Sequence, residues 1–232
     1  MKLAIISDIH ANLYALIKVL EDIDSESVDN IICLGDLVGY GPHPNEVIAL
    51  IKRKNIISLK GNYDAAVVAN EFNYIRNDNI NAFSLPWTVE ELRTSNKYYL
   101  DNLPSTLTLD VCGKKIKFVH GSPRKINEYL TEDNPDIPEV LANIEEDILV
   151  CAHTHLTYGK QIKNKIIIND GSVGKPKNGT PHATYAILDI HNDANPKVKF
   201  KTVEYEYNKI IKDMEMKKFP TMLISSYKTG KA

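Results

Sequence analysis

The sequence has few cysteines, no long apolar runs and no large excess of charge of one sign. Each of these absences excludes some classes of protein. It has only three cysteines, and none lies in a Cys-x-x-Cys pair, so neither a disulfide framework nor a thiolate metal site is expected. Its apolar runs are far shorter than the roughly 20 residues that span a bilayer. We therefore expect no membrane-spanning segment and no signal peptide, and we predict a cytoplasmic protein.

Charge of the two signs is nearly balanced, with 28 Lys and Arg against 30 Asp and Glu. The net charge of -2 gives no general attraction to nucleic acid or to an anionic membrane. Hydrophobic residues make up 43% of the 232 positions, which is the composition of an ordinary globular protein. A chain of this length buries enough apolar surface to fold without cross-links. We predict one domain over residues 1–232.

The apolar pattern predicts alternating strands and helices in the first sixty residues. Short apolar runs at residues 3–7, 31–34 and 55–59 are typical of buried strands, and two segments with helical spacing lie between them. This order implies parallel strands joined by crossover helices. Strands return after Pro104. The pattern as a whole predicts an α/β fold in which two sheets pack together with helices outside.

Residues 65–103 interrupt the strands and have a helical pattern, with one helix expected to start at Thr88. We expect this insert to lie near the functional rim as a helical lid. Its aromatic residues Phe72, Tyr74 and Trp87 are candidates for stacking on a base. The alternative is that they pack the lid against the sheet, and this alternative is favoured for Trp87.

Five clusters of polar residues each follow an apolar strand. Because ligands collect outside the carboxyl ends of strands in α/β sheets, these clusters are expected to converge on one rim. Each cluster alone is a weak signal, since Gly-Asp and Gly-Asn usually mark turns. Together they supply four histidines, two aspartates and one asparagine, which is the ligand chemistry of a divalent-metal site. The clusters are Asp8-Ile9-His10, Gly35-Asp36, Gly61-Asn62-Tyr63-Asp64, His120-Gly121 and His153-Thr154-His155.

The ordered clusters resemble the calcineurin-like metallophosphoesterase family, whose pattern is Asp-x-His, Gly-Asp, Gly-Asn-His-Asp/Glu, His and Gly-His-x-His. Other stretches resemble a small bacterial and archaeal branch of predicted phosphoesterases related to diadenosine tetraphosphatase. These stretches are residues 7–13, 35–42, 120–124 and 171–174. The likeness runs from residue 3 to about residue 190. It implies the family's four-layer α/β/β/α sandwich of two mixed sheets flanked by helices.

The resemblance also implies a dinuclear metal centre. One ion would be held by Asp8, His10, Asp36 and His155. The other would be held by Asp36, Asn62, His120 and His153, so that Asp36 bridges the two. Two divalent ions in this arrangement activate a bridging hydroxide and clamp the phosphoryl oxygens. Manganese is the first expectation, and Fe, Ni, Co or Zn also suit these ligands. The expected catalytic residues are Asp36, Asn62, Tyr63 and His120.

The chain departs from the family pattern at two positions. Tyr63 stands where the family has a general-acid histidine, a group worth roughly 10²–10⁴-fold in rate. Tyr63 either donates a proton or only fills space, and both interpretations stay open. Its presence favours substrates with good leaving groups, namely phosphoanhydrides, nucleotides and activated aryl diesters. Tyr40 replaces an arginine that grips phosphate in protein phosphatases and in symmetrically cutting diadenosine tetraphosphatases, which argues against both activities.

Three residues are candidates for substrate binding: Tyr40 and His43 in the loop after Asp36, and Arg124 after His120. Arg124 is suited to gripping phosphate with two hydrogen bonds. For His43 the alternative is an exposed loop histidine. Arg76 is a weaker candidate, for which a surface salt bridge is favoured. The Gly171–Gly174 stretch is either a backbone loop beside the site or a turn between strands.

The sequence therefore predicts a dinuclear metal-dependent hydrolase of phosphodiester or phosphoanhydride bonds. The substrate would be a small phosphorylated molecule, with nucleotides and dinucleoside polyphosphates among the options. The alternative from another class is a non-catalytic binding or scaffold module on the same fold, which should have lost some of the seven ligands. A phosphomonoesterase or protein phosphatase is less favoured. The sequence leaves the oligomeric state open, a homodimer included.

Overall fold

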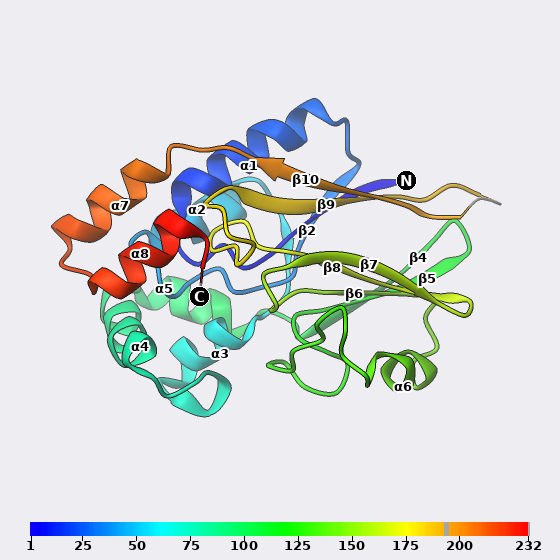
Figure 1. Cartoon of the computed structure of the whole chain (residues 1–232), viewed down its shortest axis with the longest axis horizontal. Helices are drawn as coiled ribbons and strands as arrows, with labels where there is room; N and C mark the ends of the chain where they lie inside the picture. The colour runs from blue at the N-terminus through cyan, green and yellow to red at the C-terminus, as the bar shows by residue number, and fades with distance from the viewer. Residues whose placement is uncertain (193–194, 232) are drawn as a thin grey trace.

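The structure is a computed structural model that describes residues 1–192 and 195–231. Two five-stranded sheets pack face to face, and helices cover their outer sides (Figure 1). Each sheet is mixed, with three parallel strands and two antiparallel ones. The predicted α/β sandwich of two mixed sheets with flanking helices is confirmed.

The first sheet has the strand order β10-β9-β1-β2-β3. Its parallel strands are β1 (Lys2–Ile6), β2 (Asn30–Cys33) and β3 (Ile57–Ser58). The helices α1 (Leu13–Ser25) and α2 (Pro44–Arg53) connect them. The antiparallel strands are β9 (Ala183–Asp189) and β10 (Lys197–Val203). β3 is shorter than the strand expected over residues 55–59, because only Ile57 and Ser58 pair with β2.

The second sheet has the order β4-β5-β6-β8-β7. Its parallel strands are β5 (Lys114–Val119), β6 (Ile148–Cys151) and β8 (Lys165–Asp170). The antiparallel edge strands are β4 (Thr106–Val111) and β7 (Thr157–Ile162). The short helix α6 (Ile137–Ala142) covers the outer face of this sheet, where its Val140 packs with Leu149 and Ile167.

Alternation of side chains along β1 explains the layers. Leu3 and Ile5 point into the space between the sheets, where they join a buried cluster with Phe118 and Val150 of the second sheet. Ala4 and Ile6 point to the other face and pack with the buried residues of α1 and α2. Successive residues of a strand face opposite sides, so one short apolar run serves two cores. The strands are thereby held firmly up to the loops that follow them.

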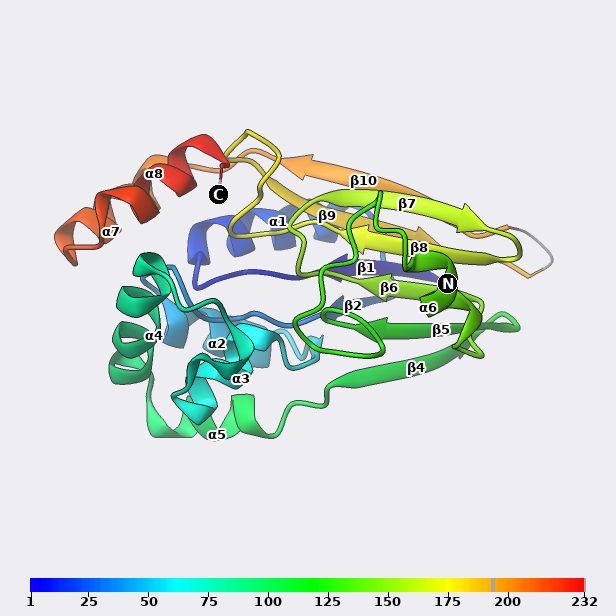
Figure 2. The ribbon, with the colours of Figure 1, turned by 60° about the horizontal axis from the view of Figure 1, so that its bottom comes forward.

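The segment predicted to be a helical insert does contain a group of helices. They are α3 (Asn62–Ala69), the 3₁₀ turn η1 (Phe72–Tyr74), α4 (Asn79–Glu91) and α5 (Thr94–Asp101). Figure 2 shows them together at one end of the molecule, beyond the ends of β1 and β2. The expected helix start at Thr88 is wrong. Asp78 caps α4 by accepting a hydrogen bond from the Asn81 amide, and Thr88 lies inside that helix, where its hydroxyl donates to the Ser84 carbonyl.

Two further helices, α7 (Tyr207–Met216) and α8 (Thr221–Thr229), follow the last strand. Buried residues from both, including Ile210 and Leu223, join the same apolar core as α1. The Tyr227 hydroxyl of α8 donates a hydrogen bond of 3.1 Å to the His10 carbonyl. Within residues 1–192 and 195–231, no helix has both the length and the apolar character needed to cross a membrane.

Candidate metal centre

The polar clusters follow β1, β2, β3, β5 and β6 at the carboxyl ends of these strands; four lie in loops, and residues 62–64 form the first turn of α3. The loops continue the pairing of the strands beyond the sheet: the Asp8 amide donates to the Gly35 carbonyl (3.0 Å) and the His10 amide to the Asp36 carbonyl (2.9 Å). Five of the candidate residues have a left-handed backbone. They are Asp8, His10, Asp36, His153 and His155, with φ between 47° and 68°. A left-handed backbone at a residue other than glycine raises the free energy of the folded state by about 1–3 kcal/mol. Strained residues of this kind cluster at functional sites.

Two glycines allow the loops to approach one another closely. A Cβ atom on Gly35 would lie 2.3 Å from the Gly61 nitrogen, and one on Gly61 would lie 2.1 Å from Asp36 Oδ1. Gly35 also has a φ of 101°, which side-chain-bearing residues rarely adopt. The Gly-Asp and Gly-Asn pairs therefore act as more than turns, because they bring Asp36 and Asn62 to the same place.

Asp64 holds these two loops together, a role that the sequence did not reveal. Its carboxylate accepts hydrogen bonds from the backbone amides of Gly61, Asp36 and Leu37, at 2.8–2.9 Å. Burial raises the pKa of Asp64 to about 6, although these amides favour its charged form. The Gly-Asn-Tyr-Asp cluster thus combines one residue that faces the site, Asn62, with one that fixes the loops around it, Asp64.

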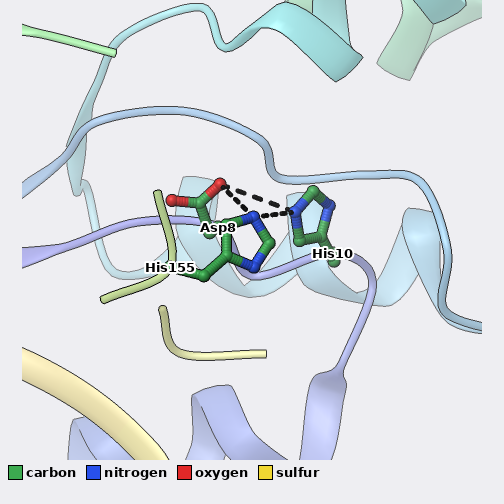
Figure 3. A group of neighbouring side chains, drawn as sticks. All are labelled: Asp8, His10 and His155. Carbon is green, nitrogen blue, oxygen red and sulfur yellow. Dashed lines mark hydrogen bonds and ion pairs between the residues drawn. The ribbon is translucent and has the colours of Figure 1, made fainter. Parts of the chain in front are cut away.

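The first group of candidate ligands consists of Asp8, His10 and His155 (Figure 3). His155 Nε2 lies 3.2 Å from Asp8 Oδ1, and His10 Nε2 lies 3.5 Å from the same oxygen. The two imidazole nitrogens are 3.3 Å apart. One carboxylate oxygen and two ring nitrogens from three different loop positions therefore point at a common centre, although His155 is far from Asp8 in sequence.

The second group consists of Asp36, His120 and His153. His120 Nε2 lies 3.5 Å from Asp36 Oδ2 and 2.8 Å from Asn62 Oδ1. Asp36 also stands beside the first group, because its Oδ2 atom is 3.7 Å from His10 Nε2. The same carboxylate oxygen therefore lies between the two groups, which is the position of a bridging ligand.

Backbone carbonyls fix the orientation of three of the four histidines. The Nδ1 atoms of His10, His120 and His155 contact the carbonyl oxygens of Val38 (3.1 Å), Leu34 (2.9 Å) and Lys175. These contacts place the proton on Nδ1 and leave the Nε2 lone pair free for a metal ion. His153 differs: it is buried, and neither of its ring nitrogens has a hydrogen-bond partner in the described part of the chain.

Burial keeps the imidazoles neutral. It lowers the pKa of His153 to about 2 and that of His155 to about 3, and it lowers the pKa values of His10 and His120 as well. A neutral imidazole is the form that binds metal ions. Burial and the neighbouring Asp8 carboxylate raise the pKa of Asp36 well above its usual range.

This set of residues fits divalent cations. Asp8 Oδ1 and both ring nitrogens of His153 are buried without a hydrogen-bond partner among residues 1–192 and 195–231. Buried polar atoms left in this way cost free energy unless something pairs with them. Cations would pair with Asp8 Oδ1 in one group and with one ring nitrogen of His153 in the other, and would remove the repulsion between the Asp8 and Asp36 carboxylates. The donors are carboxylate, amide and imidazole, which suit the divalent transition metals.

Both groups contribute to the wall of a cavity of about 470 Å³, the first through His10 and His155 and the second through Asp36 and His153. Tyr40 lines this cavity as expected of a substrate-binding residue, and its ring centroid is 4.8 Å from that of His10. His43 and Arg124 are not brought to the cavity. His43 lies against Asp213 of α7 at 2.9 Å, and Arg124 pairs with Glu128 and Asp136 on the surface, so nearby carboxylates hold both side chains elsewhere.

Tyr63 is buried beside the site. Its ring packs against Gly39 and lies 4.6 Å from the Tyr40 ring, centroid to centroid. Its hydroxyl is buried without a hydrogen-bond partner in the described residues. Burial raises the pKa of Tyr63 well above its usual value, so the hydroxyl keeps its proton.

The helical segment contributes one of its three candidate aromatics to the cavity. Tyr74 lines it, together with Ile75, Arg76 and Asp78. Trp87 instead packs on Phe219, between α7 and α8, with ring centroids 4.6 Å apart. Packing was the role favoured for Trp87, although the expected partner was the sheet. Phe72 is partly buried against the apolar core.

The sequence also missed cavity residues that follow the Gly171–Gly174 stretch. That stretch is a backbone loop beside the site, since the Gly174 amide and the Ser172 hydroxyl both donate to the Asp8 carbonyl. Lys175 and Lys177, directly after it, line the cavity, as does Tyr129. The glycine-rich loop was the signal that could have identified the two lysines.

Comparison with known proteins agrees with this geometry. The model of the calcineurin-like phosphoesterase superfamily domain matches residues 1–193. An uncharacterized protein of Methanocaldococcus jannaschii is 36% identical over 233 residues, covering 91% of this chain and 92% of the relative. The phosphodiesterase YfcE of Escherichia coli K12 is 27% identical over 190 residues, covering 82% and 88%. The crystal structure of a metallophosphoesterase from Sphaerobacter thermophilus aligns with a TM-score of 0.83 at 32% identity, covering 99% of both chains.

Proposed function

Since the chain belongs to the calcineurin-like phosphoesterase superfamily, we propose that it is a dinuclear metal-dependent hydrolase of phosphodiester or phosphoanhydride bonds in a small phosphorylated substrate. The observation that carries this proposal is the position of Asp36 between two buried groups of aspartate and histidine. The similarity to a phosphodiesterase of Escherichia coli supports the reaction class. Nucleotides are the substrates that we would test first.

The ligands divide between two ions. Asp8, His10 and His155 would hold one ion, and His120, His153 and Asn62 the other, with Asp36 shared between them. Two divalent ions supply Lewis acidity and an activated water for attack on phosphorus. The protein's own contribution is to fix three of the four rings by backbone carbonyls and to surround the centre with buried side chains. Manganese is our first choice of metal because the donors include hard carboxylate and amide oxygens.

The ligand set also bears on the alternative of a non-catalytic scaffold. Such a module has no need for seven metal-binding side chains, whereas this chain has all seven. All seven are buried and five of them line one cavity, which supports an enzyme.

The test is hydrolysis by protein loaded with Mn²⁺ and assayed in parallel with other divalent metals. The panel would contain bis(p-nitrophenyl) phosphate, p-nitrophenyl phosphate, cyclic nucleotides, nucleoside diphosphates and dinucleoside polyphosphates. We expect turnover of at least one diester or anhydride, loss of turnover with chelator, and recovery when metal is restored. Asp36→Asn is the control for contaminating phosphatases. Absence of turnover for every substrate, in protein shown by elemental analysis to carry two ions, would contradict the proposal.

A further inference from the structure

Three cationic side chains line the cavity above the candidate metal centre: Arg76, Lys175 and Lys177. They come from separate parts of the chain, Arg76 from the segment before α4 and the two lysines from the loop after β8. In the described part of the chain, none of the three forms an ion pair. They are therefore cations without a protein counter-ion, facing the space where a substrate would bind.

Lys175 is the most buried of these three cations. Only 6% of its surface is exposed, and its ammonium lies 5.0 Å above the ring of Tyr40 rather than beside a carboxylate. Burial of a charge without a partner costs several kcal/mol. Such a cost is retained where the charge serves a ligand, and the ligand that a buried ammonium recognises is an anion.

The cations flank both groups of candidate metal ligands. Lys175 lies over Tyr40, whose ring contacts His10 of the first group with centroids 4.8 Å apart. Arg76 and Lys177 both lie over the ring of Tyr129, at 5.5 Å and 5.7 Å from its centroid. That ring in turn lies 4.0 Å from the ring of His153 in the second group. Each cation is thus one aromatic ring away from a candidate ligand.

The total charge indicates what kind of anion fits. Two divalent ions, the Asp8 and Asp36 carboxylates and an activated hydroxide would together carry one net positive charge, which the single negative charge of a phosphodiester balances. The three extra cations, with Asp78 as an acidic neighbour, add positive charge that a phosphodiester leaves unbalanced. A substrate with two or more linked phosphates carries the additional negative charge that would balance it. The cavity volume of about 470 Å³ lies in the range of small-molecule sites, so it has room for such a substrate.

We propose that Arg76, Lys175 and Lys177 form a subsite for the second phosphate of a phosphoanhydride substrate, such as a nucleoside diphosphate or longer polyphosphate. The inference rests on the proposed function, and it selects anhydrides from the bond types named there. In the reaction, the oxygen of water bonds to the phosphorus at the metal centre and the bridging P–O bond breaks. The electron pair of that bond stays on the leaving phosphate, and a proton from the water passes to solvent.

This assignment also explains how the site works with Tyr63 in place of a histidine acid. A leaving phosphate gains negative charge as the bond breaks, and the three cations are positioned to stabilise that charge electrostatically. Protonation of the leaving group is then unnecessary. A neutral alcohol leaving group has no second phosphate to place in the subsite, so it gains nothing from these residues.

The test compares substrates that differ in the second phosphate. We would measure kcat/KM of the Mn²⁺-loaded protein for ADP, bis(p-nitrophenyl) phosphate and p-nitrophenyl phosphate, in wild type and in Arg76→Gln, Lys175→Gln and Lys177→Gln. Loss of one charged contact to phosphate corresponds to roughly tenfold. We expect each variant to lose about tenfold on ADP and less than about threefold on the other two. Lys125→Gln, an exposed lysine outside the cavity, is the matched control.

Binding gives a readout that does not depend on turnover. Calorimetry with imidodiphosphate, a stable analogue of pyrophosphate, should show about tenfold weaker binding to each variant, and binding of inorganic phosphate should change little. Arg76 is exposed and Lys177 is half-buried, so their variants remain informative if Lys175→Gln fails to fold.

Equal losses on all three substrates, or unchanged imidodiphosphate binding, would overturn the subsite and leave the proposed function standing. Failure of the wild-type protein, shown to carry two ions, to cleave these three substrates and every other member of the panel described above would overturn both.

Discussion

The two groups of candidate ligands differ in how firmly the protein holds them. In the first group, the Nδ1 atoms of both His10 and His155 contact backbone carbonyls. In the second, His120 is held by the Leu34 carbonyl but His153 has no such partner. A ring that is already fixed loses little freedom when a metal binds, whereas an unanchored ring must be ordered by the ion. The first group is therefore built as the tighter site, and the second as the more adaptable one.

The carboxylate that joins the two groups should give the largest effect. Asp36→Asn removes the charge that lies beside both His10 and His120. Loss of a residue that only supports a metal ligand lowers metal affinity or activity roughly 10–100-fold. We expect Asp36→Asn to lower both metal affinity and turnover by more than this. Elemental analysis and turnover of the best substrate are the measurements. Retention of two ions with unchanged turnover would show that Asp36 is not shared.

The order of metal loading tests the comparison directly. Titration of metal-free protein with Mn²⁺, followed by calorimetry, should resolve two steps. We expect the first group to fill first, because its rings are preorganised. The occupied group is identified with His155→Ala, in which the tighter step should disappear. Two indistinguishable steps would mean that the carbonyl anchors do not matter for affinity.

Replacing single histidines should lower metal affinity more in the first group than in the second. An unanchored side chain that is ordered on binding costs about 1 kcal/mol, or roughly fivefold in affinity. We therefore expect His155→Ala to weaken metal binding about fivefold more than His153→Ala does. Each variant should still bind close to one ion at the intact group. Both values come from competition with a fluorescent chelator, and a larger effect at His153 would reverse the comparison.

The smallest expected effect is at Tyr63. Phenylalanine keeps the ring that packs against Gly39 and Tyr40 and removes only a buried hydroxyl without a partner in the described residues. We expect Tyr63→Phe to change turnover by less than about twofold, and the free energy of unfolding to stay the same or to rise by about 1 kcal/mol. The measurements are kcat across substrates of different leaving-group pKa and a urea unfolding curve. A rate that falls most for the poorest leaving groups would show instead that the hydroxyl donates a proton.

The sequence predicted the frame of the molecule because local patterns determine it. The apolar runs before Asp8, Asp36 and His153 are continuous and short, which is how strands buried on both faces appear in a sequence. Turn residues after them mark where each strand ends. Parallel pairing then brings these positions to one edge, so the grouping of the polar clusters followed from topology alone.

The helical segment was predicted less well because its boundaries depend on competing local signals. Thr88 and Glu91 have the spacing of a capping box, but Asp78 caps the helix ten positions earlier. Pro86 inside α4 made a start after it seem natural, since proline interrupts the backbone hydrogen bonds of a helix. The packing of Leu85 into the core is a tertiary effect, which no local pattern encodes.

The substrate-binding candidates depended on long-range partners and were therefore the hardest to predict. His43 looked free in the sequence, but Asp213 lies beside it after the chain has folded back through α7. Arg124 is held by Glu128 and Asp136. Lys175 and Lys177 showed no ligand spacing, and only the fold of the Gly171–Gly174 loop brings them to the cavity.

The hydrogen bond from Tyr227 to the His10 carbonyl links the site to the order in which the chain is synthesised. His10 leaves the ribosome more than two hundred residues before the hydroxyl that supports its backbone emerges. One edge of β1 likewise stays unpaired until β9, with which it pairs in the finished sheet, has been synthesised. Contacts this distant in sequence form slowly. During translation the nascent protein therefore contains every candidate ligand well before it contains a finished centre, and ions captured in that interval meet a site whose geometry is still unset.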